Sequence, residues 1–217
     1  MHQRRTGEVG YSLEASGWLR KLEIFYHAHR TFVLLSAVAL LIAPLAVGLY
    51  LRGRAATERE AQAVLSRADQ EYYNGNISAA GTYYQDIVTR FGGTTSADLA
   101  YIGLGRAALV QGKPAEALSA FGKAMNARDP STAAAAKRGH AAALEDSGKP
   151  ADAASEYEEL AQHENEEDAV SDLLAAARAF KASGKNDDAR AVLARAAKDY
   201  PNTSLQRDVA LALAELR

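Results

Sequence analysis

The side chains with the most potential for chemistry lie in one acidic run in the C-terminal half of the chain. His163 is followed by four carboxylates, Glu164, Glu166, Glu167 and Asp168. Such a cluster could hold a cation weakly, but it lacks the glycine and the alternating ligand spacing of a calcium-binding loop. Acidic residues are also common in the first turn of a helix, because their negative charge interacts favourably with the positive end of the helix dipole. We therefore interpret this run as the solvated start of a helix.

The other candidate side chains do not form a recognisable catalytic set. His27 and His29 are two residues apart, which points them to different sides of a helix, and His140 falls on the inner side of a predicted helix. The absence of cysteine excludes disulfides, thiolate zinc sites and cysteine nucleophiles. Phosphate-binding, dinucleotide-binding, G-x-S-x-G and H-E-x-x-H motifs are also missing. We predict no catalytic residue, no metal site and no cofactor, and therefore a protein that is not an enzyme.

Residues 32–51 form an apolar stretch, FVLLSAVALLIAPLAVGLYL, without any charged, amide or histidine side chain. A helix rises about 1.5 Å per residue, so this length matches the roughly 30 Å hydrocarbon core of a bilayer. Arg30 and Arg52 bracket the stretch, and Tyr50 lies where an aromatic belt is expected. A cleaved signal peptide would have a shorter apolar run that starts earlier. The stretch is predicted to be a transmembrane helix, an uncleaved signal anchor in contact with the lipid bilayer.

The segment before it, residues 1–31, is predicted to contain a short amphipathic helix. Trp18, Leu22, Phe25 and Tyr26 fall on one face of a helical period. Such a helix beside a membrane span usually lies in the membrane interface. Two alternatives remain: the same residues extend the transmembrane helix into water, or their aromatic face packs on another membrane protein.

Charge gives a direction for the chain across the membrane. Residues 1–31 carry five Lys and Arg against three Asp and Glu, which favours the cytoplasm for this tail. Arg52, Arg54 and Arg59 follow the apolar stretch closely, so the balance near the membrane is almost even. The net charge of the whole chain is −2, which gives no reason to expect nucleic acid as a partner.

The remainder of the chain is built from a repeat. Gly75, Gly112, Gly148 and Gly184 recur at spacings of 37, 36 and 36 residues, each followed by a similar helical run. A glycine in the left-handed conformation ends one helix, and a second helix starts just beyond it. Pro114 and Pro150 stand at such starts, where a missing N–H costs nothing. The pattern predicts about four helix–turn–helix units.

The second helix of each unit carries residues of fixed size at fixed distances from its glycine. The small residue five positions on is Ala80, Ala117, Ala153 or Ala189. The large residue four positions later is Tyr84, Phe121, Tyr157 or Leu193, and the next inward residue is Ile87, Ala124, Leu160 or Ala196. We expect the alanines to allow close helix approach and the larger side chains to fill the space beside the next unit. Pro130 and Pro201 are expected to end the second helices of units two and four.

These residues resemble the tetratricopeptide repeat family. The match is best over residues 101–130, at Tyr101, Leu104, Gly105, Ala108, Ala117, Phe121 and Ala124. The resemblance covers about residues 60–202. It implies an all-α fold in which the transmembrane helix is followed by an α-solenoid of about four such repeats over residues 52–202. A cap helix is expected over residues 203–217, because such arrays need a polar end.

The resemblance also implies a binding surface. Members of this family usually bind other proteins in a concave groove lined by the first helix of each unit. By position, the groove would include Ile102, Arg106, Leu109, Arg138, Leu174, Arg178 and Lys181. The basic members favour a partner of acidic character, although solvated surface cations would look the same. The Lys and Asn residues of the family's carboxylate clamp are missing here.

The layout of the whole chain is similar to that of single-pass bacterial inner-membrane proteins such as the ancillary subunit of the Sec translocon. This similarity implies a bacterial inner (cytoplasmic) membrane protein with its repeat domain in the periplasm. We expect a membrane-anchored, non-catalytic scaffold or assembly factor that binds other proteins of a membrane complex. Two alternatives remain: a structural accessory subunit of a photosynthetic, respiratory or secretion complex, and a translocon-associated periplasmic chaperone-like helper.

Overall fold

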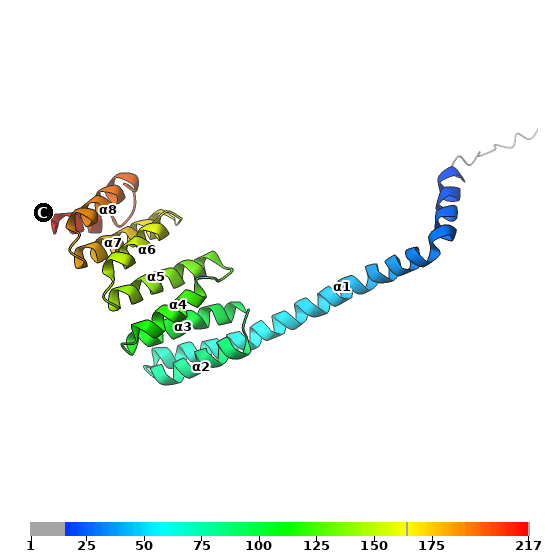
Figure 1. Ribbon diagram of the computed structural model, residues 1–217, viewed down its shortest axis with the longest axis horizontal. Coiled ribbons are helices and arrows are strands. Elements are labelled where there is room, and N and C mark those ends of the chain that lie inside the picture. Colours follow the sequence, from blue (N-terminus) through cyan, green and yellow to red (C-terminus); the bar gives the residue numbers. More distant parts are fainter. Residues whose placement is uncertain (1–15, 164, 217) are drawn as a thin grey trace, which may run out of the picture. The chain divides into compact units, whose positions relative to one another are not determined.

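The computed structural model describes residues 16–163 and 165–216, and within them all regular structure is helical (Figure 1). This confirms the all-α fold class. The helices are α1 (Ser16–Tyr73), α2 (Ile77–Arg90), α3 (Thr95–Val110), α4 (Pro114–Ala124), α5 (Pro130–Asp146), α6 (Pro150–Ala161), α7 (Glu166–Ala182), α8 (Asn186–Asp199) and α9 (Gln206–Ala214).

The chain divides into two compact units, Met1–Arg54 and Ala55–Arg217. The described part of the first unit is helix α1, which is interrupted at His29, where φ is −126° and ψ is 26°. Its apolar residues contact little else, and Leu35, Leu40 and Leu41 are all exposed. By length and composition, the helix from residue 34 onward could cross a membrane.

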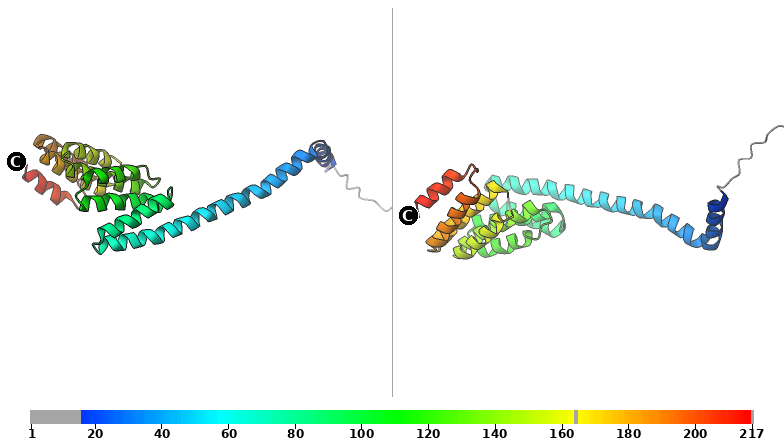
Figure 2. Two further views of the ribbon diagram at one scale, coloured as in Figure 1. Left: turned by 60° about the horizontal axis from the view of Figure 1, so that its bottom comes forward. Right: turned by 90° about the horizontal axis from the view of Figure 1, so that it is seen from above.

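The second unit is a stack of antiparallel helix pairs (Figures 1 and 2). The end of α1 packs against α2 through a core that includes Leu65 and Ile87. The pairs α3–α4, α5–α6 and α7–α8 follow, each in contact with the pair before it, and α9 closes the stack against α8. The predicted helix–turn–helix solenoid is therefore confirmed, with α1, α3, α5 and α7 as the first helices of the four units.

The four glycines that set the repeat have the predicted backbone conformation. Gly75, Gly112, Gly148 and Gly184 have φ values of 82°, 68°, 75° and 79°. The residue after each glycine donates its N–H to a carbonyl five residues earlier, as in Lys113 to Ala108 at 2.9 Å. This bond satisfies a carbonyl at the end of the first helix, so the helix ends there and the chain reverses.

The side chains predicted to pack between helices are buried. The alanines five residues after the turn glycines are 0 % exposed, and Phe121 is 1 % exposed. Phe121 lies so close to α3 and α5 that a methyl group added at Gly105 would sit 2.6 Å from its ring, and one added at Gly139 would also clash. The large side chain of Phe121, and that of Tyr84 beside Gly103, therefore require glycines on the first helices that face them.

This packing predicts opposite effects for two glycine substitutions. Gly105→Ala is expected to lower the free energy of unfolding by about 1–3 kcal/mol, because the new methyl group overlaps Phe121. Gly122→Ala on α4 meets nothing within 4 Å and is expected to raise that free energy by about 0.5–1 kcal/mol, since alanine loses less backbone entropy. Denaturant unfolding of both variants measures the difference, and a shift in the same direction would contradict the assigned packing.

One predicted helix end is wrong. Helix α4 ends at Ala124, and Pro130 is the first residue of α5 instead of the end of the preceding helix. The Asp129 carboxylate caps α5 by accepting the N–H of Thr132 at 2.8 Å. Proline fits this position because the first N–H of a helix has no partner within the helix. By contrast, Pro201 follows α8, which ends at Asp199, as predicted.

The C-terminal cap is a short helix. Helix α9 spans Gln206–Ala214, inside the predicted range 203–217, and its Val209 is 0 % exposed against the last pair. The guanidinium of Arg190 on α8 donates to the carbonyl of Leu216 at 2.9 Å. These contacts cover the apolar end of the stack.

Candidate protein-binding groove

The residues predicted to line a groove all lie on the first helices α3, α5 and α7. Each stands ten, six or three residues before the turn glycine of its unit: Ile102, Arg138 and Leu174 at ten, Arg106 and Arg178 at six, and Leu109 and Lys181 at three. These steps follow the helical period, so they place the residues on one side of each helix. All seven are exposed or half-buried. We call this side of the domain the first-helix face.

In the C-terminal half of this face, the cations are paired within the chain. The guanidinium of Arg138 on α5 donates to both carboxylate oxygens of Asp172 on α7, at 2.8 and 2.9 Å. Arg178 pairs with Glu145 at 3.0 Å, and Lys181 pairs with Glu215, the residue that follows α9, at 2.9 Å. The expectation that these cations attract an acidic partner is therefore not supported at three of the four positions.

Glu145 is held from two sides. Its carboxylate accepts the Tyr157 hydroxyl at 3.2 Å in addition to the Arg178 guanidinium. Burial and the nearby Glu145 charge raise the pKa of Tyr157 to about 12, so the hydroxyl stays protonated and donates at neutral pH. This network joins α5, α6 and α7, which indicates a structural role for this half of the face.

A small cavity lies between the last first helix and the cap. Leu174, Arg178 and Lys181 of α7 line it together with Glu215 and Leu216, and its volume is about 130 Å³. Helix α9 therefore occupies the place that the first helix of a fifth unit would take. The predicted groove residues Leu174, Arg178 and Lys181 therefore lie together around this cavity, and the Lys181–Glu215 ion pair is part of its lining.

In the N-terminal half of the face, the remaining cation lies among tyrosines. The Arg106 guanidinium stacks over the Tyr72 ring, 4.7 Å from the ring centroid, and the neighbouring Tyr72 and Tyr73 raise the pKa of Arg106. The neighbouring carboxylate of Asp69 accepts the hydroxyl of Tyr84 at 2.6 Å. Burial together with this hydrogen bond raises the pKa of Tyr84 well above its ordinary value.

Three large apolar side chains of this half were not predicted. Tyr73, Leu99 and Val110 are 75 %, 40 % and 60 % exposed. Tyr73 and Val110 both stand two residues before a turn glycine, and Leu99 follows the helical period of Ile102 and Arg106. That regular placement on the first helices was the signal in the sequence that could have identified them.

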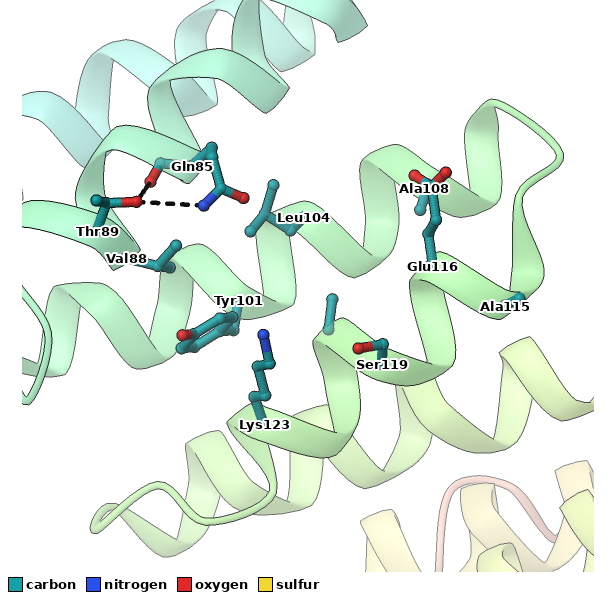
Figure 3. Close-up of a pocket in the computed structure, with 11 residues that line it drawn as sticks. Gln85, Val88, Thr89, Tyr101, Leu104, Ala108, Ala115, Glu116, Ser119 and Lys123 are labelled. Carbon is teal, nitrogen blue, oxygen red and sulfur yellow. Dashed lines mark hydrogen bonds between the residues drawn. The ribbon is translucent and has the colours of Figure 1, made fainter.

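A cavity of about 540 Å³ lies between the second helices α2 and α4, with α3 as its floor (Figure 3). Tyr101 and Leu104 of α3 line it, and the Lys123 ammonium lies 5.3 Å from the centroid of the Tyr101 ring. Gln85 and Thr89 in its wall hydrogen-bond to each other at 3.2 Å. Its polar lining consists of an amide, hydroxyls, the Lys123 ammonium and the Glu116 carboxylate.

The histidines and the acidic run take structural positions. Glu166, Glu167 and Asp168 lie in the first turn of α7, which confirms that this run starts a helix, while Glu164 lies outside the described residues. His140 is half-buried, with its Nδ1 2.9 Å from Glu156. Within residues 16–163 and 165–216, no three His, Cys, Asp or Glu side chains are placed to hold a metal ion.

The predicted interfacial face of the N-terminal segment is described only in part. The rings of Phe25 and Tyr26 are exposed on α1, and the side chains of Trp18 and Leu22 lie outside the described part of the chain. The Phe25 and His29 rings lie 5.0 Å apart between centroids. The exposed rings are compatible with a membrane interface or with a protein partner.

Comparisons with known proteins give a match to one repeat family. Models of the tetratricopeptide repeat match residues 65–133, 102–169 and 173–203. A search of curated protein sequences found no match, so the expected likeness to the ancillary Sec translocon subunit gains no support.

Solved structures agree with the family match. One similar crystal structure contains the nearly identical TPR-like repeats of a protein designated a kinesin light chain, from Podosopora anserina. It has 19 % identity and a TM-score of 0.62, covering 74 % of this chain and 86 % of the other. A single-substitution variant of that protein has 19 % identity and a TM-score of 0.59, covering 74 % and 85 %. At this identity the likeness concerns the fold alone. Because the repeat models match most of its length, the chain belongs to the tetratricopeptide repeat family.

Proposed function

We propose that the chain is a membrane-anchored, non-catalytic scaffold that holds another protein on the first-helix face of its repeat domain. The observation that carries the proposal is a set of exposed large apolar side chains on that face. They are Leu99 and Val110 on α3, and Tyr73, which holds the same repeat position on α1 as Val110 does on α3. Tetratricopeptide repeats bind other proteins, exposed apolar patches mark interaction sites, and Tyr and Arg are enriched among energetically important interface residues. Residues 52–202 supply the scaffold, and residues 203–217 close it.

The anchoring half of the proposal rests on residues 32–51. The side chains of this stretch that the structure describes are exposed, and Leu40 and Leu41 are about three-quarters exposed, at 76 % and 74 %. Apolar surface on this scale is stable in lipid and costly in water. We propose a bacterial inner-membrane location with the basic tail, residues 1–31, in the cytoplasm and the repeat domain in the periplasm.

Topology is tested by reporter fusions after Arg217. A periplasm-dependent reporter, alkaline phosphatase, is expected to be active there, and a cytoplasm-dependent fluorescent protein is expected to be dark. Replacing Leu40 and Leu41 with Arg is expected to release the protein from the membrane fraction, because each charge is costly at the centre of a lipid-facing helix. Fluorescence with an inactive phosphatase would place the domain in the cytoplasm and overturn the proposed side.

Partner binding is tested by a photo-reactive amino acid at a single position in the full chain in its membrane. At Val110, on the first-helix face, it is expected to crosslink a discrete protein. At Ala115, which is also exposed but lines the cavity between α2 and α4, it is expected to give no such product. Crosslinks from Ala115 alone, or from the apolar helix alone, would move the binding surface away from the first-helix face.

The crosslinked protein also separates the possible roles. One stoichiometric membrane protein would fit an assembly scaffold or an accessory subunit of a photosynthetic, respiratory or secretion complex. A broad mixture of newly exported chains would fit a periplasmic helper at the translocon. Val110 is not part of the ion pairs that join α5 to α7 and α7 to Glu215, so the probe at this site leaves them intact.

A further inference from the structure

The exposed side of α3 differs from that of the next first helix. It carries a continuous apolar stripe with one cation at its centre: Leu99, Ile102, Arg106, Leu109 and Val110. Leu99 and Val110 are well exposed, whereas Ile102 and Leu109 are half-buried against the core around Phe121. Because the stripe follows the helical period, its five members share one face of the helix.

Helix α5 carries nothing comparable at the same repeat positions. The corresponding residues are Ala135, Arg138, Ala142, Glu145 and Asp146, which are small or charged. Arg138 and Glu145 are also engaged with α7. The exposed apolar side chains Leu99 and Val110 are therefore not demanded by the repeat itself, because α5 carries Ala135 and Asp146 at the equivalent places.

Arg138, Arg178 and Lys181 each form an ion pair within the chain. Across residues 16–163 and 165–216, no such ion pair is formed by Arg106, whose guanidinium stacks on the ring of Tyr72. The nearby Asp69 carboxylate is hydrogen-bonded to Tyr84. Stacking on Tyr72 fixes the plane of the guanidinium, which prepares it to bind a carboxylate through two parallel hydrogen bonds.

We propose that the stripe on α3 binds a short apolar segment of the partner protein that carries one carboxylate, and that this carboxylate pairs with Arg106. This inference rests on the proposed function and names the chemistry of its partner. From Leu99 to Val110 the stripe is about 16 Å long, at about 1.5 Å per residue, which corresponds to roughly five residues of extended chain. Apolar side chains of the segment cover the stripe and exclude water, and the ion pair strengthens in the drier surroundings.

The test is a selection from a library of random displayed peptides on the full-length protein in lipid nanodiscs. Wild-type protein is expected to enrich peptides with Asp or Glu within about two residues of Leu, Ile or Phe. Arg106→Ala introduces the residue type that α5 carries as Ala142, so the fold tolerates it. This variant is expected to lose the acidic preference and to bind the best wild-type peptide about 10- to 100-fold more weakly.

Matched controls separate the stripe from charge in general. Arg195→Ala removes an exposed cation of α8 that lies outside the first-helix face and is paired with Glu158, and it is expected to leave the peptide affinity unchanged. The peptide's own Glu→Gln variant is expected to lose as much affinity as Arg106→Ala does. Val110→Asp is expected to abolish binding, because a like charge then faces the peptide. Circular dichroism of each variant checks that helicity is retained.

The outcomes distinguish this inference from the proposed function. Enrichment of neutral or basic apolar peptides, or an acidic preference that survives Arg106→Ala, overturns the carboxylate pairing. The scaffold proposal then stands if the probe at Val110 still crosslinks a protein. A concentration-dependent dimer that Val110→Asp dissolves would show a second copy covering the stripe and would also overturn the inference. If no peptide is enriched and Val110 gives no crosslink, both the carboxylate pairing and the proposed binding surface are overturned.

Discussion

Phe121→Ala is expected to lower the free energy of unfolding of the repeat domain by about 3–5 kcal/mol. The ring of Phe121 is 1 % exposed and lies where α3, α4 and α5 meet, against Gly105 and Gly139. Those two glycines have no side chain that could move into the space left by the ring. The cavity therefore stays largely open, which places the cost at the upper end of such substitutions. A lower denaturant midpoint with an unchanged slope is the measurement.

The control for this prediction uses the facing glycine. Gly105→Ala alone is destabilising because its methyl group overlaps the ring, but in the Phe121→Ala background the same methyl group enters the cavity. The double variant is therefore expected to be more stable than the sum of the two single effects, by about 0.5–3 kcal/mol of coupling. Additive effects would show that Phe121 does not pack against Gly105.

The fold was largely predictable because its determinants are local and recur in every unit. A turn glycine, a small residue five positions on and a large one four positions later define each pair without reference to any distant residue. Pro130 was misassigned because proline is common both just after a helix and at the first position of a helix. The family pattern alone favoured a proline that follows the preceding helix. The structure resolves the choice through the Asp129 cap.

The binding face was less predictable. Its positions follow from the helical period, yet the sequence did not show that Asp172 would reach Arg138 from the next first helix, 34 residues away. Pairing between units depends on how far successive helices are shifted along each other, which the spacing of glycines does not specify. For the same reason, the sequence did not predict that Arg106 would stack on a tyrosine while the other three cations would pair with carboxylates.

Arg138→Ala is expected to destabilise the domain by about 3–5 kcal/mol, although Arg138 lies on the predicted binding face. Its partner Asp172 is 2 % exposed and accepts two hydrogen bonds from this one guanidinium. Without Arg138 the carboxylate stays buried after losing that guanidinium, and the cost of removing its charge from water is no longer offset by the pair. Thermal or denaturant unfolding at neutral pH measures the loss.

The reverse substitution distinguishes a buried charge from a lost contact. Asp172→Ala leaves Arg138, whose side chain is 32 % exposed and can regain water, so its cost is expected to be clearly smaller. Arg138→Ala combined with Asp172→Ala is expected to be more stable than Arg138→Ala alone, because the buried carboxylate is then absent. Arg178→Ala removes a side chain that is 64 % exposed and leaves Glu145 its bond from Tyr157, so it is expected to cost less than about 1 kcal/mol. If Arg138→Ala were as mild as Arg178→Ala while weakening partner binding, Arg138 would belong to the binding surface, and the proposed division between an apolar N-terminal half and an ion-paired C-terminal half of the face would fail.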